Sequence, residues 1–188
     1  DSWRLDGKGP NKPHGIQDFI ACAEYLVREK YTSTSRLAAS GGSGGGILIG
    51  RAVTERPDLF AAASIYAGVV NAMRILEASN GANQKDEMGS PDNEAGAHAL
   101  YAMDVFYNVR AGVKYPPLML GAGLNDERVS PWMTAKLGAQ ILANGGQVWL
   151  RVEGDDGHGF ASTRRQRFDL FADAWSFFLQ QMGDPAFK

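Results

Sequence analysis

The sequence predicts an α/β fold, in which a mostly parallel sheet carries helices on both faces. Short apolar runs of strand length alternate with longer runs whose apolar residues recur every three or four positions. The first pattern is typical of strands buried on both faces, and the second is typical of amphipathic helices. Their alternation implies a parallel sheet, because the chain crosses back through each helix. With 188 residues and 44% hydrophobic composition, we expect one domain over residues 1–188.

The first elements are predicted to be a loop, a helix and a strand. Residues 1–15 are polar and rich in glycine, proline and lysine, which is typical of a loop. From Ile16 to Lys30 the apolar residues have helical spacing, and we expect Cys22 in this helix to be a buried small hydrophobe. The run from Arg36 to Ser40 is apolar enough for a buried strand.

A Gly-x-Ser-x-Gly pattern centred on Ser43 follows this strand and precedes a run that continues as a helix. Strand, tight turn and helix are the setting of a nucleophile elbow, in which the serine is strained and glycine is needed on both sides. The helix that follows directs free N–H groups and a partial positive charge at a developing oxyanion. The alternative is a flexible linker, but linkers seldom lie between two apolar runs.

Further strands and helices are predicted after the elbow helix, which ends near Arg56 because Pro57 follows it. We expect strands at Phe60–Tyr66, Pro117–Gly121 and Gln147–Val152, and helices at Pro131–Ala143 and Arg165–Met182. The last helix carries one apolar face, made of Phe168, Phe171, Ala172, Trp175, Phe178 and Leu179.

The segment from Ala67 to Tyr115 has a looser pattern. Residues 80–96 are polar and contain glycine, while Ala97–Tyr107 is predicted to be a short helix. We expect this segment to lie over the edge of the sheet, where substrate pockets are often built.

A serine hydroxyl needs a base to take its proton and an acid to orient that base. In a parallel sheet such groups lie on loops at the carboxyl ends of strands. His158 follows the fourth predicted strand and has glycine on each side, whereas His14 precedes the serine and His98 falls in the loosely patterned segment. Asp126 comes directly after the third predicted strand. We therefore predict a catalytic triad of Ser43, His158 and Asp126.

Three other carboxylates are alternatives to Asp126. Glu127 is its neighbour, but its side chain is free to point to solvent. Asp155 and Asp156 lie close to His158 in sequence. Residues so near in sequence rarely orient a side chain as well as a group from another loop, so turn chemistry explains them better.

Short motifs along nearly the whole chain fit around these residues. They are Asp18-Phe19-Ile20-Ala21-Cys22-Ala23-Glu24-Tyr25-Leu26, Gly41-Gly42-Ser43-Gly44-Gly45, Arg56-Pro57-Asp58-Leu59-Phe60, Tyr107-Asn108-Val109, Tyr115-Pro116-Pro117, Asn125-Asp126-Glu127-Arg128-Val129 and Gly157-His158-Gly159-Phe160. Together they resemble the catalytic domain of the prolyl oligopeptidase family of serine peptidases. The resemblance implies an α/β-hydrolase fold, an oxyanion hole that includes the backbone N–H of Gly44, and a substrate carbonyl bound by Arg128.

The chain departs from this family's pattern in two places. Gly44 stands where prolyl oligopeptidase has asparagine, and the tryptophan that stacks on the substrate proline there would fall near Gln84. Tryptophan occurs instead at Trp3, Trp132, Trp149 and Trp175.

The family's early strands, its tyrosine oxyanion donor and its gating β-propeller come before the point at which this chain starts. The resemblance therefore implies that residues 1–188 are the C-terminal portion of the catalytic domain. The N-terminal part of the same enzyme is then the expected partner, and the strand before Ser43 would otherwise lie near an open sheet edge.

These observations predict a serine hydrolase that cleaves short peptides through an acyl-enzyme. A carboxylester hydrolase with the same triad is the alternative, and a hydrolase-like fold that only binds a partner is a third hypothesis. A net charge of −2 without a basic tract argues against nucleic acid, and the apolar runs are too short to span a membrane. No metal and no organic cofactor are implied, and the expected compartment is cytoplasmic or periplasmic.

Overall fold

The computed structural model describes residues 2–159 and 163–183, and its centre is a parallel sheet of four strands in the order β1-β2-β3-β4. The strands are β1 (Ala38–Gly42), β2 (Ala62–Tyr66), β3 (Leu118–Gly123) and β4 (Val148–Glu153). All three strand pairs are parallel. Each strand begins and ends within two residues of its predicted bounds, so the predicted class is confirmed.

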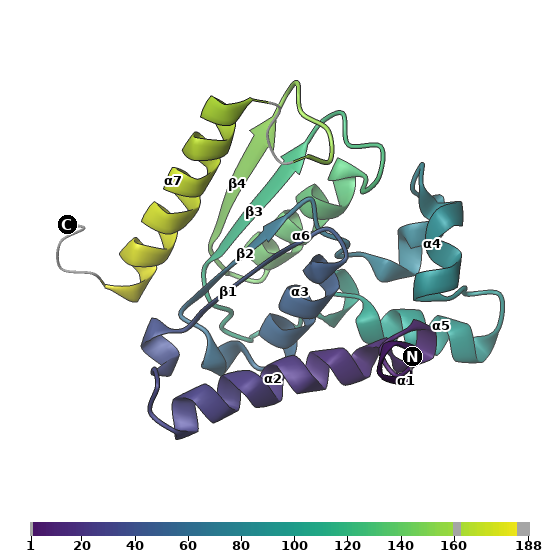
Figure 1. Cartoon of the computed structure of the whole chain (residues 1–188), viewed down its shortest axis with the longest axis horizontal. Coiled ribbons are helices and arrows are strands. Elements are labelled where there is room, and N and C mark those ends of the chain that lie inside the picture. Colours follow the sequence, from purple (N-terminus) through teal and green to yellow (C-terminus); the bar gives the residue numbers. More distant parts are fainter. Residues whose placement is uncertain (1, 160–162, 184–188) are drawn as a thin grey trace.

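One face of the sheet is covered by α3 (Gly45–Glu55) and α6 (Pro131–Ala143), which pack on β1–β2 and β3–β4 respectively. The helix α2 (Lys12–Arg28) lies outside α3 (Figure 1). Buried aliphatic side chains join the sheet to these helices, among them Ile47, Ile65, Leu120, Leu137 and Ile141. This layer contains most of the hydrophobic core.

The opposite face carries α7 (Arg164–Met182), so helices cover both faces as predicted (Figure 1). Only part of the apolar face predicted for this helix is buried: Phe178 packs on the sheet, and Leu179 is partly buried. Leu170, Phe177 and Phe178 are buried, whereas Phe168, Phe171 and Trp175 are 60%, 54% and 62% exposed. Helical spacing shows which residues share a face, but it does not show which face meets the sheet.

The predicted N-terminal loop is shorter than expected. It contains α1 (Ser2–Leu5) and the 3-10 helix η1 (Gly9–Asn11), and α2 begins at Lys12 with proline in its first turn. Asp1 lies outside the described residues. The buried positions of α2 are Ile16, Ile20 and Ala23. Cys22 points away from that row and is exposed, which corrects the expectation that it is buried.

The segment between β2 and β3 packs most closely on helices and on other parts of itself. It consists of η4 (Ala72–Glu77), α4 (Gly81–Met88), α5 (Glu94–Met103) and η5 (Phe106–Asn108). The helix α4 was not predicted, because it is polar on nearly all sides. The remaining short elements are η2 (Thr34–Arg36) and η3 (Pro57–Leu59). Within the described residues, no helix has the length and apolar character needed to cross a bilayer.

Candidate active site

Ser43, His158 and Asp126 form one hydrogen-bonded row at the carboxyl ends of the strands. His158 Nε2 lies 2.9 Å from Ser43 Oγ, and His158 Nδ1 lies 2.8 Å from Asp126 Oδ2. The three side chains follow β1, β4 and β3 respectively. The imidazole can thus accept the proton of the serine hydroxyl while its other nitrogen donates to the carboxylate.

The backbone at Ser43 is left-handed, with φ of +54°, a conformation that is uncommon and costly for residues other than glycine. Three backbone hydrogen bonds hold it: Ser43 N–H donates to the Tyr66 carbonyl (3.0 Å), while the Ser43 carbonyl accepts from Gly46 (2.9 Å) and Val69 (2.9 Å). A Cβ on Gly41 would stand 2.6 Å from the Ile49 side chain, so the strand must approach α3 without a side chain there. The strained turn is therefore held by its neighbours.

Asp126 lies on the loop after β3 and is almost fully buried. Its Oδ1 atom accepts the backbone N–H groups of Arg128 and Val129, both at 2.9 Å, while Oδ2 faces His158. These bonds fix the carboxylate in one orientation. Ser79 was not singled out from the sequence, yet its hydroxyl donates to the Glu127 carbonyl at 2.7 Å and ties the segment after β2 to this loop.

The loop that carries His158 is joined to the acid loop. Leu124 N–H donates to the Glu153 carbonyl (2.9 Å), and Asn125 N–H donates to the Asp156 carbonyl (3.0 Å). A Cβ on Gly123 would stand 2.3 Å from that same carbonyl, so only glycine allows this approach. The two loops therefore hold acid and base at a fixed separation. Phe160, the last residue of the predicted motif, lies outside the described residues.

The remaining histidines and acids stand elsewhere. His14 lies on α2, where Nδ1 is 3.1 Å from the Asp6 carbonyl, and His98 is an exposed residue of α5 beside Glu94. Asp155 is exposed, whereas Asp156 is buried in the loop before His158.

The two predicted binding groups lie close to the row. Gly44 is the first residue after Ser43 and caps α3, and within the described ranges no acceptor takes its N–H. Arg128 is exposed, and its guanidinium forms no ion pair or hydrogen bond with another described residue. The Gly44 N–H and the Arg128 guanidinium thus have no acceptor among the described residues.

A cavity of about 450 Å³ lies beside Ser43 on the face of the sheet that carries α7. Its walls include Ser40, Ser64 and Tyr66 from β1 and β2 and the exposed Phe171 and Trp175 from α7. Burial raises the pKa of the Tyr66 phenol well above its ordinary value, so this hydroxyl is neutral next to the site. Tyr66 could not be singled out from the sequence, because its position beside Ser43 depends on the register of β1 and β2.

Among the described residues, no group of three or more His, Cys, Asp or Glu side chains is arranged to hold a metal ion.

The chain is also similar to known proteins along nearly its whole length. The sequence pattern of the prolyl oligopeptidase family matches residues 1–185. A prolyl endopeptidase of Elizabethkingia miricola is 35% identical over 96% of this chain, and dipeptidyl aminopeptidase BI of Pseudoxanthomonas mexicana is 32% identical over 97%. The chain spans 26% of the length of each of these two relatives.

Solved structures agree with the sequence relatives. A prolyl endopeptidase structure, from a study of inter-domain dynamics in two such enzymes, superposes with a TM-score of 0.91 at 34% identity, over 96% of this chain and 27% of that one. A parallel α/β sheet, motifs across the chain and a family match over residues 1–185 lead to one conclusion. This chain belongs to the prolyl oligopeptidase family.

Proposed function

We propose that the protein is a serine peptidase that hydrolyses short peptides through an acyl-enzyme. The observation that carries this proposal is the row of Ser43, His158 and Asp126, with 2.9 Å and 2.8 Å between the hydrogen-bonding atoms. The backbone strain at Ser43 supports it, because such strain collects at functional sites.

In the proposed mechanism, Ser43 Oγ attacks the carbonyl carbon of the substrate while His158 Nε2 takes the hydroxyl proton. Asp126 holds the imidazole in the required tautomer and stabilises the imidazolium. The oxyanion of the tetrahedral intermediate accepts the Gly44 N–H at the start of α3. His158 then gives its proton to the leaving amine, and a water molecule activated by the same imidazole cleaves the acyl-enzyme.

Peptide amides are the proposed substrates, and Arg128 is the proposed contact to a peptide carbonyl. Its exposed guanidinium is free of other described partners, and its backbone N–H already belongs to the acid loop. The alternative activity is hydrolysis of carboxylic esters, which needs the same triad and a differently shaped pocket. The names of the relatives, prolyl endopeptidase and dipeptidyl aminopeptidase, support the peptidase.

We further propose that this portion works together with an N-terminal part of the same enzyme that supplies the early strands and the second oxyanion donor. β1 is one of the two outer strands of the described sheet and pairs only with β2 there. The half-exposed aromatic residues Phe171 and Trp175 line the cavity beside it. An unpaired strand beside apolar surface is prone to aggregate unless it is covered.

Labelling with a fluorophosphonate tests the proposed function, because this reagent modifies an activated serine. The protein should be labelled at Ser43, and Ser43→Ala should lose the label together with about 10⁶ of its turnover. Parallel assays on peptide amides and short acyl esters then separate peptidase from esterase. A folded protein that is not labelled would support the third hypothesis, a fold that only binds a partner.

A further inference from the structure

A buried carboxylate lies outside the triad row and has three hydrogen-bond donors. Asp104, directly after α5, and Asn71, in the segment after β2, are both 0% exposed. Asp104 Oδ2 accepts the Asn71 side-chain amide (2.7 Å) and the Met73 N–H (2.9 Å), while Oδ1 accepts the Tyr107 N–H (2.8 Å). Burying a carboxylate is costly unless it is hydrogen-bonded in this way. The group therefore joins two stretches of chain that are far apart in sequence.

The cluster extends to α6, the helix that follows the Asp126 loop. Lys136 Nζ donates to Asn71 Oδ1 at 2.7 Å, and the ammonium lies 4.4 Å from the ring centre of Phe106 and 5.2 Å from that of Trp132. The positive charge partly offsets the buried negative charge, and the two rings hold the ammonium in place.

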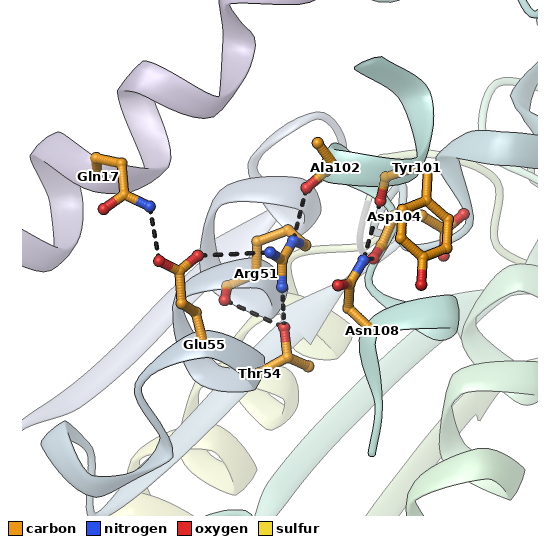
Figure 2. Close-up of polar contacts among 8 residues, drawn as sticks. All are labelled: Gln17, Arg51, Thr54, Glu55, Tyr101, Ala102, Asp104 and Asn108. Carbon is orange, nitrogen blue, oxygen red and sulfur yellow. Dashed lines mark hydrogen bonds and ion pairs between the residues drawn. The ribbon is translucent and has the colours of Figure 1, made fainter. Parts of the chain in front are cut away.

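Arg51 joins the same stretch to α3, the helix that begins next to Ser43. Figure 2 shows its guanidinium between Thr54 on its own helix and the Ala102 carbonyl at the end of α5. It donates to the Thr54 hydroxyl at 2.6 Å and to the Ala102 carbonyl at 2.8 Å. Glu55 lies 3.4 Å from the guanidinium. The stretch from Ala102 to Asn108 is thus attached to α3, to α6 and to the segment after β2.

From this cluster, hydrogen bonds lead to the nucleophile. Phe106 N–H donates to the Val70 carbonyl (2.9 Å), and Val69 N–H donates to the Ser43 carbonyl (2.9 Å). The turn that carries Val69 is itself strained, since Ala67 has φ of +41°. Two strained residues other than glycine, Ala67 and Ser43, therefore depend on surroundings that fix them.

We propose that Asp104 is a positioning residue for Ser43, and this inference rests on the proposed function. The Asp104 carboxylate fixes Asn71 and Met73, which keeps Val69 against the elbow and keeps Ser43 Oγ in line with His158. Asp104 touches neither the triad nor the space above it, so it acts on the rate of attack and leaves substrate affinity unchanged.

The test is Asp104→Asn in the active protein, assayed by fluorophosphonate labelling and by ester hydrolysis per titrated active site. The change keeps the shape of the side chain but turns one acceptor oxygen into an amide that faces N–H donors. We expect labelling and kcat per active site to fall about tenfold to a hundredfold, with KM unchanged, since small misplacement of reacting groups is that costly. Ile141→Val, in the fully buried core of α6, is the control: it should melt at a lower temperature yet react at the parent rate per site.

Two more variants sharpen the test. Combining Asn71→Asp with Asp104→Asn exchanges the carboxylate and the amide. The carboxylate then accepts from Lys136 and from the new amide at position 104, so much of the labelling rate should return. If Asp104→Asn fails to fold, Lys136→Met is the substitute, because it removes only the ammonium. It should also slow labelling, but by a smaller factor.

Parent-like labelling per active site in Asp104→Asn, or in Lys136→Met where the former is unfolded, would overturn the positioning role. A parent protein that is not labelled would instead overturn the proposed function, and this inference with it.

Discussion

Gly46 and Gly68 lie back to back, with no room for a side chain between them. A Cβ on Gly46 would stand 2.7 Å from Gly68 Cα and 2.9 Å from the Val69 nitrogen. Gly46 belongs to the first turn of α3, and Gly68 to the turn after β2. This close approach lets the Val69 N–H reach the carbonyl of the strained Ser43. The hydrogen bond that supports Ser43 therefore depends on glycine at both positions.

The first prediction concerns that contact. Gly46→Ala should lower the free energy of unfolding by at least about 1–3 kcal/mol, because both clashing partners are backbone and cannot move aside as a flexible side chain would. Gly45→Ala is the matched control, since a Cβ there meets nothing within 4 Å. In thermal and urea unfolding, Gly46→Ala should be clearly less stable than Gly45→Ala. Equal stabilities would show that the turn after β2 yields easily.

The second prediction distinguishes the candidate acids. Asp126→Asn should lower kcat by about 10⁴, as loss of the orienting carboxylate does in other serine triads. Asp155→Asn, an exposed change in the histidine loop, should leave kcat near the parent value. Steady-state rates on one ester substrate suffice for both. A large loss in Asp155→Asn, with little loss in Asp126→Asn, would reverse the assignment.

Arg128→Met is the third test. If the guanidinium binds a peptide carbonyl, kcat/KM on peptide amides should fall by an amount equivalent to about 1.5–3 kcal/mol, the contribution of a charged hydrogen bond. Small acyl esters, which have no such carbonyl, should react at the parent rate. Glu127→Gln on the same loop controls for a general change in local charge. Equal losses on amides and esters would contradict the role in peptide binding.

The fourth prediction is a dependence of stability on alkaline pH. Burial raises the pKa of Tyr66 above its ordinary value of 10.0, so the folded state favours the neutral phenol. The stability that this phenol contributes is therefore complete below about pH 10 and is lost as the pH rises above it, where the unfolded chain ionises first. Between about pH 9 and 11, the free energy of unfolding should fall more steeply with pH for the parent than for Tyr66→Phe. Tyr101→Phe, an exposed change, should follow the parent; parallel curves for Tyr66→Phe and the parent would refute the prediction.

The sequence predicts the sheet and the proximity of Ser43, His158 and Asp126, for a physical reason. Strands buried on both faces must be apolar throughout, which makes runs such as Leu118–Gly123 visible without any tertiary information. Chain order and strand ends then restrict where His158 and Asp126 can lie. Their catalytic roles, like those of Gly44 and Arg128, remain predictions that the experiments above address.

Features that depend on partners far away in the chain were not predictable. Cys22 and Phe171 are apolar in the sequence, but only the packing decides that both are exposed. In the sequence, Asp104 looks like an ordinary residue at the end of a helix. Its cluster could not be predicted, because Asn71 and Lys136 come from two other parts of the chain.

The distance in sequence between Ser43 and His158 has a consequence for folding. Their hydrogen bond closes a loop of 115 residues, and the intervening chain must first pair β2 and β3 with their neighbours. Contacts of such high sequence separation are slow to form. Reactivity of Ser43 should accordingly be the last property to return when the denatured protein is refolded, after helical circular dichroism has recovered. Recovery of Ser43 reactivity would therefore report that the whole sheet has formed.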